Sequence, residues 1–233
     1  MVVNAKGHPS APSLVEKLTA LTPRYAMKPR GRRALARVMA PGLISSPPSD
    51  YSVEGFLRTG SLFVHIPKAA GNSVAYALYG NRGAGHETIG YFQDVFRSPA
   101  IERFYTFTFV RNPWDRVFSA YTFLKSGGWR KGDQEFVAAF LSDCDSFEQF
   151  VLERLPRDDV REKIHFKPLG HFLKTGAGEW FPFDFVGRFE RFADDFEMVK
   201  SHVNPQAVLK HRNRTDGVAP GGYRDGNTSE MID

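Results

Sequence analysis

The sequence predicts an α/β fold in which helices flank a central parallel sheet on both faces. Two observations carry this prediction: apolar, strand-like runs alternate with stretches of helical periodicity, and two of the runs lead directly into a helix start. A length of 233 residues and an aromatic content of 14% suit one domain of this class with a sizeable core and an extension. Ligands of such folds bind at the carboxyl ends of the strands.

The N-terminal segment, residues 1–55, differs in composition from the rest of the chain. It is rich in Pro, Ser and basic residues, which predicts a loosely ordered, solvated extension with one short helix near Arg32 to Met39. A basic patch that recruits an anionic polymer or a membrane surface is the alternative. The folded domain is then expected to cover residues 56–233.

The first strand-to-helix junction runs from Ser61 to Tyr79. An almost continuous apolar run predicts a strand over Ser61–Ile66 that is buried on both faces of a parallel sheet. Pro67 ends the strand and a short loop of small residues follows. Apolar residues at helical spacing then predict a helix over Ser73–Tyr79.

This loop has the composition of an anion site. The amide groups of a helix's first turn face the preceding loop, where the helix dipole also favours negative charge. Lys68 supplies a full positive charge, Gly71 lets the backbone approach a ligand closely, and Ser73 adds a hydroxyl donor. The order is not that of a Walker sequence, in which the Lys follows the second Gly. A Pro-terminated strand with a solvated Lys is the plainer interpretation.

The second junction, Phe104 to Tyr121, strengthens the anion-site interpretation. Aromatic and β-branched residues predict a buried strand over Tyr105–Val110, and Arg111 stands at its carboxyl end. A helix is expected over Pro113–Lys125, capped by Asn112 and with a proline suited to its first turn.

Polar residues of this junction divide into two expected roles. Arg111 and Ser119 are expected to embrace a phosphate with a planar fork and a hydroxyl, whereas Arg116 is expected to be structural, as a salt-bridge partner. Four apolar residues at helical spacing predict the core face of the helix: Val117, Ala120, Tyr121 and Leu124.

Three further elements are expected: helices over Ser146–Leu155 and Phe192–His202 and a strand over Phe183–Gly187. Ser146 and Gln149 form a capping-box pattern at the start of the first of these helices. The glycine-rich stretch from Leu124 to Asp133 carries Trp129 among basic residues. It is either a mobile lip that contacts a sugar or a flexible surface loop.

The motif HIPKAAGNS, followed about 40 residues later by FVRNPWDRVFSAY, resembles the carbohydrate-type sulfotransferases of sulfotransferase family 2, whose motifs are close to HIPKTAGTS and VRNPxxRxxSxY. FDFVGRFERFADDFEMV from Phe183, and HRNRTDG from His211 with Tyr223 beyond it, follow in the family's order. The resemblance therefore covers about Gly60 to Tyr223. It implies a P-loop-NTPase-like three-layer fold with a central parallel sheet flanked by helices.

The sequence departs from the family pattern at four places. Ala69 and Asn72 replace Thr residues often seen in relatives, and residues 165–169, HFKPL, stand where many relatives carry Pro-Gln. The chain ends at Asp233 where relatives continue into another helix, so the domain is expected to be short at its C-terminus.

The resemblance implies that 3′-phosphoadenosine 5′-phosphosulfate (PAPS) is the sulfuryl donor and that the acceptor is a hydroxyl, of a carbohydrate. The donor's 5′-phosphosulfate would be held by Lys68, Ala70, Gly71, Asn72 and Ser73, and its 3′-phosphate by Arg111 and Ser119. No metal is expected, because the sequence has no zinc or magnesium ligand spacing.

Two residues are expected to carry the chemistry. Lys68 would neutralise the bridging oxygen as the nucleotide departs. A general base must accept the acceptor's proton, and of the seven His residues His86 lies between the two motifs, where carbohydrate sulfotransferases commonly carry a base. Glu87 and His171 are the substitutes, and His65 is expected to point inward in support of the site.

Composition limits the partners and the compartment. A net charge of +5 favours anionic partners, but no nucleic-acid-binding pattern occurs, so nucleic acid is not expected. The single cysteine, Cys144, excludes an internal disulfide and fits a reducing compartment. No stretch has the length of a transmembrane helix or a secretion signal, which favours a cytoplasmic, bacterial protein.

Two other functions stay open at this stage. The chain could be a catalytically idle nucleotide-binding module of the same fold, because of its short C-terminus or its changed Pro-Gln position. A magnesium–ATP phosphotransferase is less favoured, because the Walker order and a magnesium-binding acidic strand end are both missing.

Overall fold

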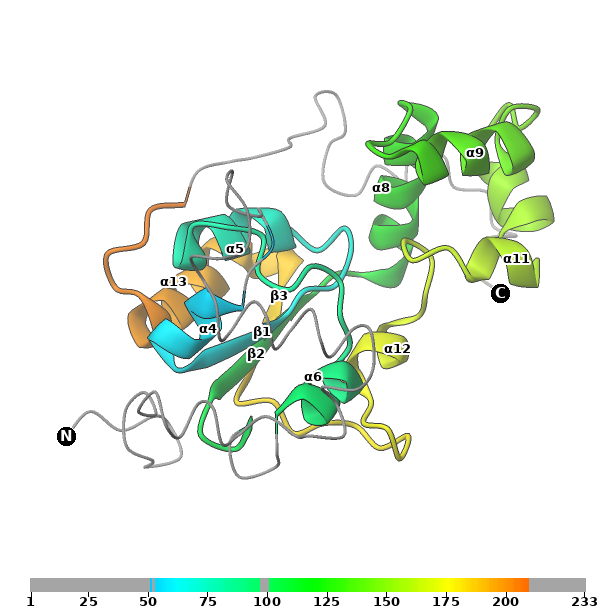
Figure 1. Ribbon diagram of the computed structural model, residues 1–233. Coiled ribbons are helices and arrows are strands. Elements are labelled where there is room, and N and C mark those ends of the chain that lie inside the picture. Colours follow the sequence, from blue (N-terminus) through cyan, green and yellow to red (C-terminus); the bar gives the residue numbers. More distant parts are fainter. Residues whose placement is uncertain (1–50, 52, 97–100, 210–233) are drawn as a thin grey trace. The chain divides into compact units, whose positions relative to one another are not determined.

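The computed structural model describes residues 51, 53–96 and 101–209 (Figure 1). These residues divide into two compact units. The first contains the chain up to Val110 and from Leu169 onward, and the second contains Arg111–Pro168. The expected extension with its helix near Arg32, and the HRNRTDG segment with Tyr223, lie outside the described residues.

The first unit is built on a parallel sheet of three strands in the order β1-β2-β3. The strands are β1 (Ser61–Val64), β2 (Tyr105–Val110) and β3 (Phe185–Arg188). Phe63 lies opposite Phe107 in the register, and Phe107 lies opposite Phe185. The predicted α/β fold with a central parallel sheet flanked by helices is confirmed.

Two strands are shorter or shifted relative to the prediction. Pairing of β1 ends at Val64, two residues before Ile66, and β3 begins at Phe185 instead of Phe183. The reason for the late start of β3 is a side chain: the Asp184 carboxylate accepts the backbone amide of Thr106 at 2.8 Å and its hydroxyl at 2.9 Å. This carboxylate takes the donor that a strand neighbour would otherwise bind.

One face of the sheet is aromatic and is covered by helices. The Phe63 and Phe107 rings stack with their centroids 4.9 Å apart. Helix α13 (Phe192–Val203) packs on this face, where its Phe192 meets Phe109 at 5.4 Å and its His202 stacks on Tyr105 at 4.9 Å. Helix α5 (Gly71–Tyr79) lies beside α13, and α4 (Glu54–Thr59) packs on α5 and β1.

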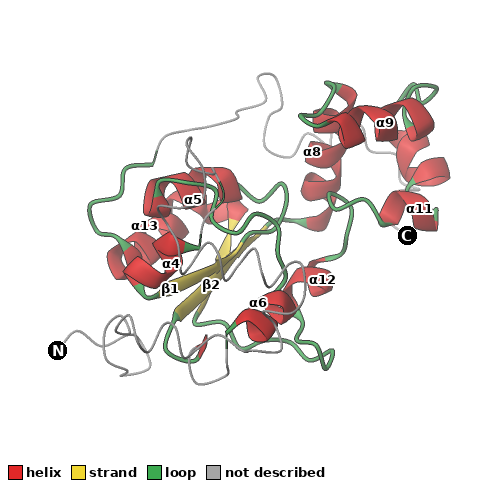
Figure 2. Ribbon diagram, viewed as in Figure 1, coloured by secondary structure: helices red, strands yellow, loops and turns green. Residues whose placement is uncertain are grey.

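The other face of the sheet carries the alternate residues, including the fully buried Leu62 and Val64. Helices α6 (Ile89–Val95) and α12 (Leu169–Leu173) contact each other and lie on this side of the strands (Figure 1). Figure 2 shows helices on both sides of the sheet, as expected of strands with two buried faces.

The second unit has helices and turns but no strand within Arg111–Pro168. Its elements are α8 (Pro113–Lys125), α9 (Lys131–Phe140), α10 (Phe147–Gln149), the π-helical turn η1 (Phe150–Arg154) and α11 (Asp158–Arg161). Its core includes three of the four α8 residues predicted to be buried, and the thiol of Cys144. The fourth predicted residue, Val117, packs against this core while partly exposed.

The helix predicted over Ser146–Leu155 is divided. A short α-helical turn is followed directly by η1, in which the helix widens to the π form. The capping box is also only half formed: Ser146 Oγ accepts the Gln149 amide at 3.0 Å, whereas the Gln149 side chain accepts the amide of Asp145.

The connection predicted as a loop from Leu124 to Asp133 is shorter than expected. Helix α8 continues to Lys125 and α9 begins at Lys131, so the turn between them holds only residues 126–130. One carboxylate closes this turn, because Asp133 Oδ2 accepts the amides of Trp129 at 3.1 Å and Arg130 at 3.2 Å. The indole of Trp129 is exposed and contacts Phe123 edge-on.

In the described part of the chain, none of the helices combines the length and the apolar character needed to cross a membrane.

Candidate active site

The turn between β1 and α5 has an unusual backbone. Lys68 and Ala70 have φ angles of 66° and 60°, in the left-handed region that side chains with a Cβ seldom adopt. Such a conformation costs on the order of 1 kcal/mol per residue and persists only where the surroundings impose it. The two residues turn the chain sharply in the short stretch between the end of β1 and Gly71, the first residue of α5.

The start of α5 lacks a side-chain cap of the kind that α6 and α8 have. Ala70 occupies the cap position and offers no acceptor, and the first turn contains no acidic residue. By contrast, Thr88 caps α6 and Asn112 caps α8 through their side-chain oxygens. The N–H groups at the start of this nine-residue helix therefore face the turn that carries Lys68, which is the arrangement of an anion site.

Gly71, the first residue of α5, is required by close packing against a side chain. A Cβ added at this position would lie 1.8 Å from Cδ2 and 2.1 Å from Nε2 of His65. The sequence predicts that Gly71 admits a ligand, but in this structure the space beside its Cα is filled by the His65 imidazole. The histidine follows β1 and its ring stacks on Phe63 with centroids 5.6 Å apart.

His65 is buried and held in its neutral form. Burial lowers the pKa of His65 well below its ordinary value, and the positive charges that His86 and Arg82 can carry lower that pKa further. Its Nδ1 is enclosed and has no hydrogen-bond partner in the described structure. A buried nitrogen of this kind costs about 1–3 kcal/mol, so an apolar side chain would be more favourable for stability alone.

His86 lies against His65. The two ring centroids are 4.3 Å apart with the planes inclined by 61°. His86 Nδ1 donates a hydrogen bond to the His65 carbonyl oxygen at 3.1 Å. In a neutral imidazole this bond places the proton on Nδ1 and leaves the lone pair on Nε2. A general base needs such a free lone pair. His86 is half-buried.

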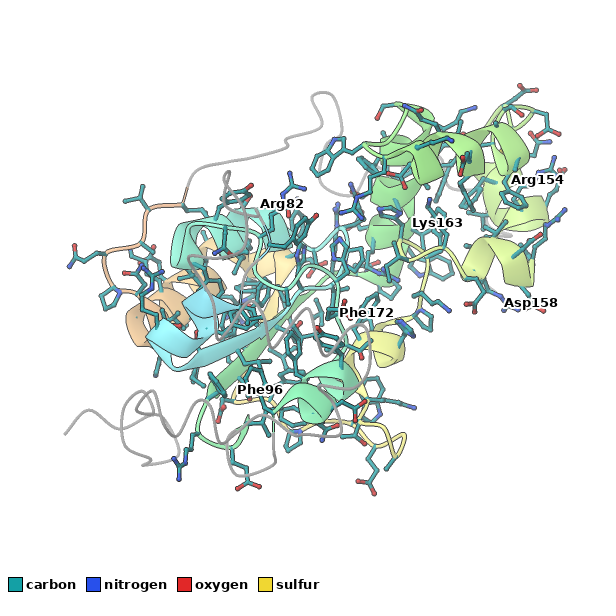
Figure 3. The ribbon with its side chains drawn as sticks, in the orientation of Figure 1. Arg82, Phe96, Arg154, Asp158, Lys163 and Phe172 are labelled. Atoms are coloured by element: carbon teal, nitrogen blue, oxygen red, sulfur yellow. The ribbon has the colours of Figure 1, made fainter. Side chains whose placement is uncertain are left out.

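Arg82 is a member of this group that sequence reasoning missed (Figure 3). It donates to the hydroxyl of Tyr51 at 3.2 Å and to that of Tyr76 at 3.4 Å. These hydrogen bonds raise the pKa of the guanidinium above its ordinary value. No motif points to Arg82; the only sequence signal is a cation just beyond the helix that follows the Lys68 turn.

The other residues predicted to hold the donor's 5′ end belong to this same turn and helix start. Ala70 is the cap residue of α5, Asn72 is half-buried in the first turn, and Ser73 is buried beside it. The structure thus brings Lys68, Gly71 and these residues together, with His65 and His86 alongside within the first unit.

Arg111 and Ser119 belong to the second unit and are described within it. Arg111 begins the unit, and its Nε is buried. The predicted cap that follows is confirmed, since Asn112 Oδ1 accepts the amides of Trp114 at 3.0 Å and Asp115 at 3.4 Å. Ser119 is half-buried in the middle of α8.

Arg116 has a structural role, as expected, but its partners differ from the prediction. It donates to the backbone carbonyl oxygens of His165 at 3.1 Å and Lys167 at 2.5 Å, where a carboxylate was predicted. Burial lowers the pKa of Arg116 to about 10. The guanidinium thereby ties α8 to the HFKPL segment, and the sequence has no local signal for such a contact.

The two substitutes for the base differ in exposure. Glu87, next to His86, is half-buried, whereas His171 is exposed on α12 and contacts Phe172 edge-on. Among the described residues no group of three or more His, Cys, Asp or Glu side chains is arranged to hold a metal ion.

Comparison with known proteins gives one match. A family model described as "Sulfotransferase family" matches residues 58–216, which is more than half of the 233-residue chain and includes both strand-to-helix motifs. No curated protein and no solved structure matches the chain.

Proposed function

The chain belongs to the sulfotransferase family, and from this premise we propose that it transfers the sulfuryl group of PAPS to a hydroxyl of a carbohydrate acceptor. The observation that carries the proposal is the start of α5, which has no side-chain cap and follows Lys68 by three residues. A buried parallel strand that leads into a cation and an open helix start is suited to a phosphosulfate group, because charge and N–H donors converge there.

The donor's 5′ end is assigned to the first unit. Lys68 supplies the positive charge, the first-turn amides of α5 supply donors in fixed directions, and the Ser73 hydroxyl adds another donor. The group bound there would bring an already activated sulfur, so the protein's main work is positioning and charge stabilisation.

The donor's 3′-phosphate is assigned to Arg111 and Ser119. The guanidinium of Arg111 presents two parallel N–H donors to a phosphate, and the hydroxyl of Ser119, in the middle of α8, can donate a further hydrogen bond. Asn112 already caps the start of α8, so the side chains of Arg111 and Ser119, and not the helix amides, carry this half of the proposal.

His86 is proposed as the general base. Its Nε2 accepts the proton of the acceptor hydroxyl as the acceptor oxygen bonds to sulfur and the bond from sulfur to the 5′-phosphate oxygen breaks. Lys68 and the α5 amides stabilise the negative charge that develops on the leaving oxygen. The products are the sulfated acceptor and adenosine 3′,5′-bisphosphate.

Binding and transfer assays test the proposal in two steps. Calorimetry should give tighter binding of adenosine 3′,5′-bisphosphate than of ATP with magnesium, and radiolabelled PAPS should transfer its label to one or more members of a panel of glycans and small hydroxyl compounds. Preference for magnesium–ATP would overturn the proposal. Binding of the bisphosphate with no transfer to any acceptor would instead support an idle nucleotide-binding module.

Variants separate the proposed roles. Arg111→Ala should weaken bisphosphate binding, whereas His86→Ala should leave binding intact and lower kcat by about 100-fold or more, as loss of a general base does. Glu87→Gln and His171→Ala should retain turnover. Full turnover in His86→Ala would rule out this base, and loss of turnover in either of the other two variants would identify its replacement.

A further inference from the structure

We propose that His65 is the positioning residue of this site: its ring holds the Lys68–Ser73 turn in place through Gly71 and orients the imidazole of His86. The inference rests on the proposed function for the identity of the donor. The contacts that support it are properties of the fold alone.

The contact with Gly71 couples the ring to the donor turn. The Cδ2–Nε2 edge of His65 occupies the position where any larger residue would place its Cβ. Gly71 is also the first residue of α5, and its neighbours Ala70 and Lys68 are held in left-handed conformations. Because interiors are close-packed, a change in the size or position of the ring must move the helix start and the turn before it.

The contact with His86 couples the same residue to the proposed base. The His65 ring supports the His86 ring at a centroid distance of 4.3 Å, and the His65 carbonyl oxygen accepts its Nδ1 proton at 3.1 Å. A base oriented on both sides in this way loses rotational freedom before the acceptor arrives. His65 therefore contacts both the turn proposed to bind the donor and the histidine proposed as the base.

The choice of histidine at this position is not explained by stability. Its buried Nδ1 has no partner in the described structure, which carries a cost that phenylalanine would avoid. The ring is flat enough to stack on Phe63 and narrow enough to lie over Gly71. Protonation of this ring would place a charge beside His86 and Arg82, the two charged or titratable groups that act on it.

A reciprocal size exchange tests the contact with Gly71. Gly71→Ala should lower the affinity for adenosine 3′,5′-bisphosphate by at least about tenfold, because the new methyl group collides with the ring. The double variant His65→Ala/Gly71→Ala removes the collision and should recover most of that loss. Gly176→Ala is the matched control, since its added Cβ would have no atom within 4 Å. If the losses of affinity in the two single variants simply add in the double variant, the proposal is wrong.

A second set of variants distinguishes positioning from a merely structural role. His65→Ala should lower kcat and also broaden the tautomer population of His86, observed as mixed Nδ1 and Nε2 protonation by nitrogen NMR. His65→Phe restores a ring, though a larger one, and should recover both readouts in part. His202→Ala, which removes a stacked ring elsewhere in the same unit, should change neither. Unaltered His86 tautomers in His65→Ala would contradict the inference.

Failure of the proposed function gives a different pattern of results. A protein that does not bind the bisphosphate at all would refute the PAPS assignment. In that case the exchange is measured by thermal unfolding, where Gly71→Ala should again be rescued by His65→Ala. No rescue in unfolding would overturn the role of His65 independently of the ligand.

Discussion

His65 and Gly71 illustrate how the requirement for one residue type can have an unexpected cause. A glycine in a loop before a helix is usually assigned to the approach of a ligand or to a positive φ. Here the glycine is the first helical residue, and it leaves room for the imidazole of His65, the residue that follows β1. The left-handed conformations fall instead on Lys68 and Ala70, which both have a Cβ.

The buried His65 predicts a pH dependence of stability. Its folded-state pKa lies below the unfolded value, so between these two pKa values the unfolded chain binds more protons than the folded one. The free energy of unfolding should therefore fall as pH drops below about 6.5, by up to about 1.4 kcal/mol per pH unit, until the folded pKa is reached. Denaturant unfolding of the protein and of His65→Phe between pH 7.5 and 4.5 measures this. The free energy of unfolding should change less steeply with pH in His65→Phe. Equal slopes in the two proteins would mean that His65 does not cause the pH dependence.

At the scale of elements, the helix starts that follow β1 and β2 have opposite chemistry. The start of α5 lacks a side-chain cap, whereas Asn112 caps α8 through two hydrogen bonds. An open start can receive a ligand's negative charge, and a capped start stabilises the helix itself. This difference is why we propose that the amides of α5 bind the donor's 5′ end, whereas only side chains around α8 bind its 3′-phosphate.

Removing the α8 cap should therefore affect stability. Asn112→Ala leaves the amides of Trp114 and Asp115 without their acceptor and should lower the free energy of unfolding of the second unit by about 1 kcal/mol. Asn112→Asp, which keeps an acceptor oxygen and adds a charge favourable to the dipole, is the control and should cost little. A chemical denaturation curve followed by helical circular dichroism measures both; equal losses in the two variants would argue against a capping role.

The start of α9 depends on an ion pair within the second unit. Lys163 Nζ lies 2.8 Å from Asp133 Oδ1, and both side chains are largely buried. Burial alone would raise the pKa of Asp133, but the hydrogen bonds from Lys163, Trp129 and Arg130 outweigh burial and lower it. The carboxylate thus closes the turn before α9 and joins it to the segment around Lys163 (Figure 3).

Loss of the Lys163 cation should lower the free energy of unfolding more at neutral pH than in acid. Lys163→Met leaves a buried carboxylate with only its amide donors and should destabilise the unit by about 3 kcal/mol at pH 7. Since the folded pKa of Asp133 is depressed, the stabilisation is present above the unfolded pKa and is lost as pH falls below about 4. Unfolding followed by Trp129 fluorescence, with Trp114 and Trp180 replaced by Phe, should give a smaller difference at pH 3 than at pH 7. Lys131→Met, at a side chain 90% exposed, is the control.

At the scale of the molecule, the described residues form two units with different contents: a sheet with the Lys68 turn, and a helical unit that begins at Arg111. The boundary falls directly after β2, between Val110 and Arg111. The first motif therefore lies entirely in the unit with the sheet, whereas the second motif, from Phe109 to Tyr121, crosses the boundary.

A ligand that binds only the folded protein stabilises it by mass action. Adenosine 3′,5′-bisphosphate at about 100 times its Kd should add about 2.7 kcal/mol to the free energy of unfolding, which is a rise of several degrees in Tm for a chain of this size. Differential scanning calorimetry with and without the bisphosphate measures the shift. Lys68→Met should reduce it at the same ligand concentration, whereas Lys131→Met should not. An equal shift in all three proteins would exclude Lys68 from donor binding.

Most of the fold could be predicted because its signals are local. The strand of Tyr105–Val110, the helix of Pro113–Lys125 and the Asn112 cap all follow from residues adjacent in sequence. Five helices of the described residues were missed. Four of them, α4, α6, α11 and α12, have seven residues or fewer, and α9 begins at Lys131 beside a glycine-rich stretch that resembles a loop. The glycine-rich stretch ends where the carboxylate of Asp133 accepts the amides of Trp129 and Arg130. Asp133 is the third residue of α9, a position where the capping-box pattern has Glu or Gln.

The sequence by itself determined the three strands with the helices that follow them, the family, and the two cationic junctions, because periodicity, capping and short motifs act between near neighbours in the chain. Only the tertiary structure decided that the His65 ring lies on Gly71, that His86 donates to the His65 carbonyl, and that Arg116 binds carbonyl oxygens instead of a carboxylate. These contacts join residues 6, 21 and 49 positions apart. Their physical basis is close packing and the pairing of buried polar groups, which depend on what the fold brings together and leave no local pattern.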